Sequence, residues 1–230
     1  MRVARVATVA ALALSLAFPV FASDPVENAV PARNAITVSL TVDRWPDIEG
    51  VEFVPEGADV SELGGFSEGG YGFEAAYARR TPLKTGHMLE WGGEFGAFWN
   101  EGRGETVLIQ PDGRTARRRI GANAGYLTAS VRWHVATGRQ SSVFVGAGAG
   151  MYLIVIKESI EDWTADFDIS GEAPGGYLCG GLDVGLAESG KTAIRVEARA
   201  HAFSFSESEF QGQELGGPLY ALHLGLTWRF

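Results

Sequence analysis

The sequence predicts an all-β fold, an eight-stranded antiparallel up-and-down barrel that crosses a membrane. Three observations support this prediction. Residues 218–230 alternate between a wholly apolar face and a small or polar face, as the two sides of one strand do. Seven earlier stretches of the chain alternate in the same way. Long and short connections also alternate along the chain, which is typical of membrane barrels with short turns at one end and long loops at the other.

Aromatic residues lie near both ends of the predicted apolar faces. Tyr220 begins the apolar face of the last strand, and Trp228 and Phe230 end it. Trp91 and Trp99 repeat the spacing of Tyr220 and Trp228 on the third strand. Because aromatic belts at both membrane interfaces flank a lipid-facing band, the pattern predicts an outer face in lipid. The predicted lipid-interface girdle is Tyr71, Tyr77, Trp91, Trp99, Trp133, Tyr220, Trp228 and Phe230.

Residues 1–22 have the features of a secretory signal peptide. Arg2 and Arg5 precede a short apolar run, and small residues precede a predicted cleavage site after Ala22. A membrane anchor is the alternative, but the run is short for a spanning helix and contains Pro19. The chain is therefore expected to be exported.

The remainder of the chain is expected to form one domain. Residues 23–35 are short and polar and should be a periplasmic lead-in, followed by the barrel over 36–230. A formal net charge of −9 disfavours nucleic acid as a partner. The single Cys179 excludes an intrachain disulfide. A mean hydropathy of +0.02 fits strands in which apolar and polar faces average out.

The first four predicted strands place apolar residues at every second position. Val38, Phe73, Phe95 and Leu127 are examples of side chains expected to face outward. A tight turn at Pro111–Gly113 predicts a hairpin over 105–120 that extends beyond the membrane. The four strands are predicted at residues 36–42, 70–80, 87–100 and 121–135.

The last four strands follow the same rule. The fifth contains a Gly-x-Gly-x-Gly run, 146–150, which also occurs in nucleotide-binding loops. The glycines here are spaced strictly by two and no helix follows, so that function is excluded. Two acidic connections, 43–68 and 157–173, are expected to be long loops and lack the spacing of a calcium loop. The strands are predicted at residues 143–156, 175–187, 193–205 and 218–230.

These features resemble the small eight-stranded outer-membrane β-barrel superfamily, which includes OmpA transmembrane-domain-like, OmpX-like and opacity-protein barrels. The resemblance rests on the signal peptide, the alternating strands and three motifs, VGAGAG at 145–150, RVEARAHAF at 195–203 and LGLTWRF at 224–230. It covers essentially the whole exported chain and implies a porin-like, monomeric protein in the outer membrane of a Gram-negative bacterium. The C-terminal aromatic residue would serve as a signal to the barrel-assembly machinery. A soluble lipocalin-like barrel is the alternative, and it leaves the girdle unexplained.

Ionisable residues are expected to line the barrel interior. At eight strands the lumen is narrow, so a network of ion pairs that fills it is favoured over an ion path. The predicted interior network is Glu74, Glu90, Glu94, Arg132, Asp183, Arg195, Glu197, Arg199, His201, His223 and Arg229.

His201 and His223 are the residues considered for catalysis or metal binding. If the last hairpin turns symmetrically near Gly212, the two histidines sit opposite each other. No third ligand is evident, so neither a metal nor a cofactor is expected. Barrel lipid A deacylases use a His-x-Ser pair, whereas His201 and Ser204 are one residue too far apart and face opposite sides.

The function expected from the sequence is that of a non-enzymatic barrel, structural or surface-exposed, whose loops contact an extracellular partner. A lipid A-modifying enzyme and a narrow ion-conducting barrel are the alternatives. Outer-membrane lipid and lipopolysaccharide are expected surroundings. The basic residues that could contact lipopolysaccharide phosphates are Arg114, Arg117, Arg118 and Arg119.

Overall fold

The computed structural model describes residues 33–45, 48–49, 59–62, 69–84, 86–100, 105–109, 115–138, 140–160, 167–186, 190–203, 214–215 and 218–230. The predicted signal peptide and most of the predicted lead-in, residues 1–32, lie outside this set. Within the described residues, no helix is long and apolar enough to span a membrane.

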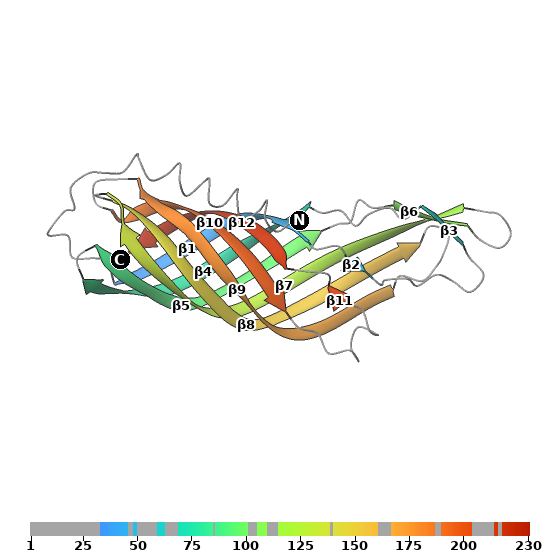
Figure 1. Cartoon of the computed structure of the whole chain (residues 1–230), viewed down its shortest axis with the longest axis horizontal. Helices are drawn as coiled ribbons and strands as arrows, with labels where there is room; N and C mark the ends of the chain where they lie inside the picture. The colour runs from blue at the N-terminus through green and yellow to red at the C-terminus, as the bar shows by residue number, and fades with distance from the viewer. Residues whose placement is uncertain are drawn as a thin grey trace.

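Eight long strands form a closed antiparallel barrel (Figure 1), which confirms the predicted fold class. The order around the wall is β7-β5-β4-β1-β12-β10-β9-β8, and pairing of β7 with β8 closes the ring. Their bounds are β1 Asn34–Arg44, β4 Gly69–Lys84, β5 His87–Asn100, β7 Thr115–Ala136, β8 Ser141–Ile160, β9 Phe167–Gly185, β10 Thr192–Phe203 and β12 Leu219–Arg229.

Four short strands lie outside the ring. β3 (Asp59–Glu62) pairs with β6 (Glu105–Ile109), and β11 (Glu214–Leu215) pairs with β2 (Ile48–Glu49). β6 pairs with β7 at residues 115–119, directly beyond the stretch of β7 that pairs with β5. The two arms of the predicted 105–120 hairpin are therefore paired and continue the barrel wall outward (Figure 1), whereas its predicted turn at Pro111–Gly113 lies outside the described residues.

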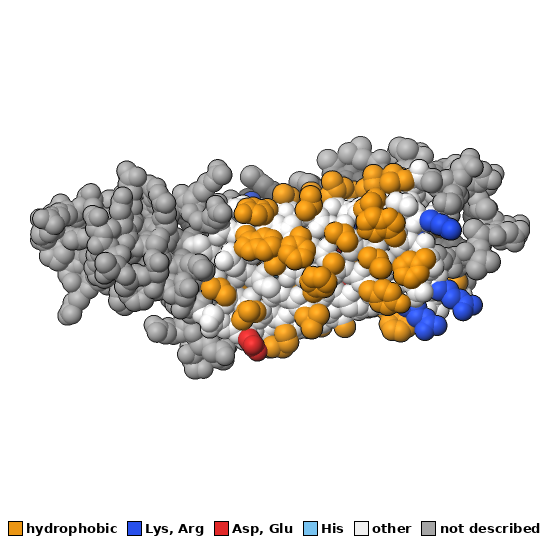
Figure 2. Space-filling view, turned by 180° about the vertical axis from the view of Figure 1, so that it is seen from behind, with side chains coloured by type: hydrophobic (Ala, Val, Ile, Leu, Met, Phe, Trp, Pro, Cys, Tyr) orange, Lys and Arg blue, Asp and Glu red, His pale blue; other side chains and the backbone are white. Residues whose placement is uncertain are grey.

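Alternation along each strand decides which side chains reach the lumen. On β1, Leu40 is 73% exposed on the outer face, whereas the next residue, Thr41, is only 3% exposed. The same period holds on β10 and β12. Figure 2 shows the result, a wall covered with hydrophobic side chains. Because soluble proteins rarely expose a contiguous apolar surface of this extent, this wall fits lipid rather than water.

Several predicted element boundaries were wrong. The predicted loop 157–173 contains strand, because β8 and β9 remain paired out to Glu158 and Phe167. β4 continues to Lys84, so most of the predicted turn at 81–86 is also strand, and the chain reverses near Gly86 at a φ of 77°. Outside the membrane a ladder can continue on hydrogen bonds without strict apolar alternation, and the sequence pattern therefore underestimates its length.

The barrel wall is uneven in height. β7, β8 and β9 have 22, 20 and 19 residues, whereas β1, β10 and β12 have 11, 12 and 11. The three long strands stand out from the barrel as a sheet that Figure 1 shows extending past the other strands of the ring. We call this sheet, formed by the paired parts of β7, β8 and β9 beyond Gly121, Ile154 and Gly175, the ridge.

Glycines make room for large side chains in the lumen. A Cβ atom on Gly148 would lie 2.3 Å from the Tyr177 ring, and one on Gly150 would lie 2.0 Å from the Leu127 carbonyl oxygen. The predicted role of small residues inside a narrow barrel thus has a specific cause: the neighbouring ring and backbone occupy the space a side chain would need.

Candidate functional site

The lumen nearest the short turns holds five charged residues, which we call the lower layer: Arg80, Glu90, Asp183, Arg195 and Arg229. Arg195 binds Asp183 through Nε at 2.8 Å and Glu90 through Nη1 at 2.9 Å. Arg229 Nη2 donates to the second Asp183 oxygen at 3.0 Å, and Arg80 Nε lies 3.5 Å from Glu90. Both carboxylates are therefore held by two guanidinium groups each.

A second group of five, the middle layer, lies further along the lumen: Glu74, Glu94, Arg132, Glu197 and Arg199. Arg199 donates to Glu197 at 2.7 Å, to Glu94 at 3.0 Å and to Glu74 at 2.8 Å. Arg132 lies 2.6 Å from Glu94 and 3.1 Å from Glu197. Each charge in this layer thus has at least one partner of opposite sign.

Tyrosines complete the middle layer. The hydroxyl of Tyr126 donates to Glu74 at 2.5 Å, and that of Tyr177 donates to Glu94 at 2.5 Å. The guanidinium of Arg199 also lies 4.4 Å from the centroid of the Tyr177 ring. These rings occupy lumen volume that water or ions would otherwise fill.

Taken together, the two layers balance in charge, with five arginines and five carboxylates; Asp43 is a further buried carboxylate that belongs to neither layer. Half of the ion pairs between arginines and carboxylates join strands that are not neighbours, such as β10 with β5, so these pairs cross the lumen. A buried, neutral network of this kind closes a narrow barrel, because any ion passing through must displace paired charges. All eleven predicted interior residues are buried in the lumen.

Arg80 belongs to the lower layer but was absent from the predicted network. It is 7% exposed and continues the inward series of Glu74, Ala76 and Ala78 on β4. The signal was available in the period-two pattern. Arg80 was left out of the predicted network because it is the last residue of the predicted strand 70–80, and the alternation of faces was not extended to the strand's end.

Above the charged layers the lumen is closed by apolar and aromatic side chains, here called the apolar cap. Its members are Trp45, Phe98, Ala122, Ala124, Tyr126, Tyr152, Ile154, Leu219 and Ala221, with Phe203 packed against them. The members of the apolar cap come from several strands, among them β5, β7, β8 and β12. The alternating sequence pattern did not predict this cluster.

His201 and His223 lie just below the cap, but the predicted register was wrong. His201 pairs with Leu219 and His223 pairs with Glu197, so the hairpin is not centred on Gly212. The two rings nevertheless approach, with centroids 6.4 Å apart. His201 Nδ1 shares a 2.9 Å hydrogen bond with the Tyr152 hydroxyl. Ser204, the proposed nucleophile of the enzyme alternative, lies outside the described residues.

A different serine contacts a histidine near the short turns. His134 Nδ1 lies 3.2 Å from Ser142 Oγ, and its Nε2 lies 3.6 Å from Glu90. The order serine, histidine, acid matches that of nucleophilic hydrolases. Glu90, however, is already bound by Arg195, and His134 packs on the ring of Phe144 at 4.9 Å. The contact was not predicted because the three residues come from strands β8, β7 and β5.

Glu90, His134 and Asp183 also form the group that best matches a metal site among the described residues. Each offers one ligand atom, and these atoms lie within 4.8 Å of one another. Arg195 sits between the two carboxylates, with contacts of 2.8 and 2.9 Å. A divalent cation would have to displace that guanidinium, so the donor set suits an arginine better than a metal.

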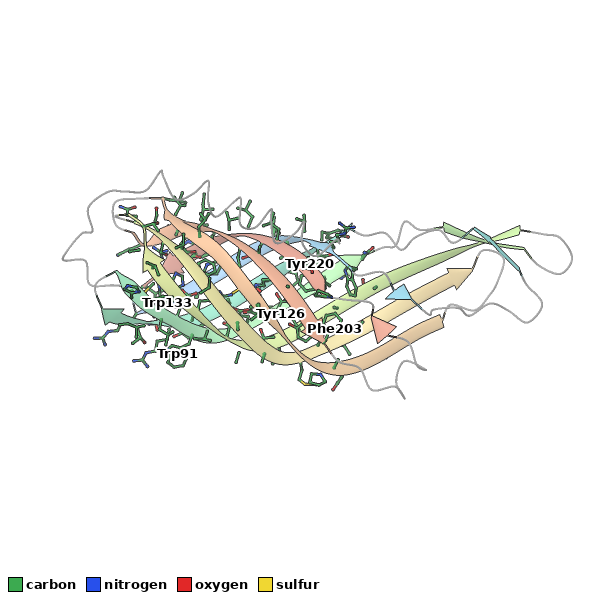
Figure 3. The ribbon with its side chains drawn as sticks, in the orientation of Figure 1. Trp91, Tyr126, Trp133, Phe203 and Tyr220 are labelled. Atoms are coloured by element: carbon green, nitrogen blue, oxygen red, sulfur yellow. The ribbon has the colours of Figure 1, made fainter. Side chains whose placement is uncertain are left out.

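The predicted girdle residues all lie on outward positions of the wall. Figure 3 shows Trp91 and Trp133 at the end with the short turns and Tyr220 toward the opposite end. Tyr71 contacts Trp99 with ring centroids 6.0 Å apart, in the same outer group as Tyr220. Tyr77, Trp228 and Phe230 lie near the short turns. Of the predicted lipopolysaccharide contacts, Arg114 lies outside the described residues, and Arg117, Arg118 and Arg119 are described only in their backbone pairing on β7.

No family model and no curated protein sequence matches the chain. Solved structures match it in shape. The attachment invasion locus protein Ail of Yersinia pestis is 12% identical with a TM-score of 0.50, covering 87% of this chain and 100% of Ail. The fold is that of a small outer-membrane β-barrel.

Other outer-membrane barrels match less well. Neisserial surface protein A has a TM-score of 0.47 at 10% identity, and the match covers 86% of this chain and 97% of the Neisserial protein. The outer membrane protease OmpT from Escherichia coli has a TM-score of 0.43 at 8% identity, covering 89% and 99%. In an outer-membrane barrel the short turns face the periplasm and the long connections face outward. The ridge of this barrel lies at the end opposite the short turns (Figure 1).

Proposed function

We propose that this chain is a non-enzymatic protein of the Gram-negative outer membrane, exported by residues 1–22, that presents its ridge to an extracellular partner. The filled lumen carries this proposal. Two charged layers, which balance each other in charge, and an apolar cap occupy the interior, so the surfaces left for function are the wall and the ridge. The wall suits lipid, which leaves the ridge for contact with other molecules.

The ridge offers an open strand edge. Pairing of β9 with β10 ends at Gly175, whereas pairing of β9 with β8 continues to Phe167. Among the described residues, the backbone of 167–174 therefore has a strand neighbour on one side only. Unpaired N–H and C=O groups on such an edge bind an extended peptide by adding a strand. The partner that fits is a polypeptide with an exposed extended segment.

Ail, whose name describes attachment and invasion, supports this proposal through its similar fold alone. A second support is the open edge of β9, and Pro174 lies at the end of this edge nearest the barrel. Proline lacks a backbone donor, so strand addition would begin above it. The partner segment would thus lie along 167–173.

A proline scan tests the edge. Single prolines at Asp168, Ile169, Ser170 and Gly171 remove one backbone donor each, and alternate donors face β8 or the open edge. Prolines facing the open edge are expected to leave heat-dependent gel mobility unchanged and to lower binding of cells displaying the barrel to host-cell or matrix surfaces. Prolines whose position would donate to β8 serve as the comparison set, because they break hydrogen bonds within the ridge and not at its open edge. Equal binding by all four folded variants would contradict the edge as the contact site.

The contact between Ser142 and His134 keeps a hydrolase as the alternative function, with lipid A as the substrate class considered. Lipid A mass spectra from envelopes with and without the chain separate the two. We expect identical spectra, because Glu90 is neutralised by arginines and the lumen is filled. Loss of an acyl chain that disappears with Ser142→Ala or His201→Ala would overturn the non-enzymatic function.

A further inference from the structure

The charged residues on the described outer surface are unevenly distributed between the two rims of the barrel. Three exposed basic residues, Arg33, Arg79 and Lys191, lie at the rim with the short turns. Exposed Arg44 and Glu172 lie at the opposite side, one of each sign. Figure 2 shows Lys and Arg side chains gathered beside the hydrophobic wall at the end that carries the short turns.

Two of the three cations lie at or one residue away from the register partner of an exposed girdle tryptophan. Arg79 is the register partner of Trp91, which is 48% exposed. Lys191 directly precedes Thr192, whose register partner is Trp228, 43% exposed. A cation beside an amphipathic ring at the edge of an apolar band places a positive charge at headgroup depth.

The backbone at Arg33 and the backbone at Arg79 are joined through the start of β1. Asn34 is the register partner of Arg79 and directly follows Arg33. The Tyr77 hydroxyl donates to Asn34 Oδ1 at 3.1 Å, which holds that ring at the rim. The Arg80 backbone N–H donates to the Arg33 carbonyl at 2.7 Å, so the backbone that carries Arg33 is also fixed. The backbone of both arginines is thus held at the same rim, beside the apolar wall.

We propose that this rim binds anionic phospholipid headgroups of the periplasmic leaflet, with Arg79 beside Trp91 as the first contact and Arg33 and Lys191 adding positive charge at the same rim. The inference rests on the proposed location in the outer membrane. Guanidinium groups bind phosphate through paired hydrogen bonds, and the adjoining apolar side chains, such as Ile36 at 40% exposure, contact the acyl chains.

Lipid selection by the folded barrel tests the proposal. The full chain is reconstituted with phosphatidylcholine and phosphatidylglycerol of the same acyl chains, and the retained lipid is measured by native mass spectrometry. We expect enrichment of phosphatidylglycerol, and a fall in that enrichment of about fivefold for each of Arg33→Gln, Arg79→Gln and Lys191→Gln. Arg44→Gln, a cation beside Tyr220 on the opposite rim, is the matched control and should retain the enrichment.

Each other outcome overturns the inference. No enrichment by the inserted wild-type barrel, or an equal loss with Arg44→Gln, removes the short-turn rim as a phospholipid site. Stronger retention of lipid A than of phosphatidylglycerol, dependent on the same three cations, would assign the rim to lipopolysaccharide. A chain that does not insert into either bilayer, shown by gel mobility that heating leaves unchanged, contradicts the proposed location, whereas an inserted barrel without lipid selection contradicts this inference alone.

Discussion

The hydroxyl of Tyr177 donates a 2.5 Å hydrogen bond to Glu94 across the lumen, from β9 to β5. These two strands are not neighbours in the wall. Glu94 also binds Arg132 and Arg199, so one carboxylate joins side chains from three other strands. The interior network therefore connects opposite sides of the barrel. Loss of these contacts should lower the stability of the barrel before it raises its permeability.

Glu94→Leu should destabilise the barrel strongly. Removing this carboxylate leaves the buried Arg132 and Arg199 with fewer partners, and breaking a buried pair costs about 3–5 kcal/mol. The free energy of unfolding is measured by urea titration in phospholipid vesicles. Arg44→Gln, exposed on the outer rim, should change that free energy by about 0.5 kcal/mol or less. Similar values for the two variants would show that the network contributes no cross-bracing.

Gly148→Ala should force Tyr177 away from Glu94. The new Cβ would lie 2.3 Å from the tyrosine ring, and overpacking of this kind costs about 1–3 kcal/mol. Gly93→Ala is the matched control, because its nearest neighbouring atom lies at 3.9 Å. The comparison uses the same urea titration. An alanine at 148 that is as well tolerated as one at 93 would contradict the packing described here.

Arginine on the outer wall should be costly in proportion to its depth. Leu127, 67% exposed, faces out near the middle of β7, whereas Leu83, 55% exposed, lies beside the turn that follows β4. In bilayers, Leu127→Arg is expected to cost about 2–4 kcal/mol and Leu83→Arg about 0–1 kcal/mol. Measuring both variants in vesicles and in detergent separates lipid from protein effects. Equal costs at the two positions would place the apolar wall outside the membrane.

The wild-type barrel should show no steady single-channel conductance in planar bilayers. Five arginines paired with five carboxylates and the apolar cap leave no described path for an ion. Arg199→Ala is the informative variant, because it removes a cation that three carboxylates share. Steady wild-type current that Arg199→Ala abolishes would instead establish the narrow ion path considered from the sequence.

The sequence by itself determined the faces of the strands. A period of two assigns every side chain to the lumen or the wall, so the burial of Glu94, Arg132 and Arg199 and the exposure of Leu40 could be predicted without coordinates. The strand count and the alternation of short and long connections followed from the same pattern, and so did the membrane-barrel fold.

Only the tertiary structure decided which inward residues meet. The period fixes a side chain's face but not its height or its partner across the lumen, because those depend on the tilt and stagger of all eight strands. His223 therefore pairs with Glu197 rather than His201, and Ser142 meets His134 although neither contact is visible in the sequence. The ridge also emerged from the structure alone, because its strands continue on backbone hydrogen bonds that side-chain hydropathy does not record.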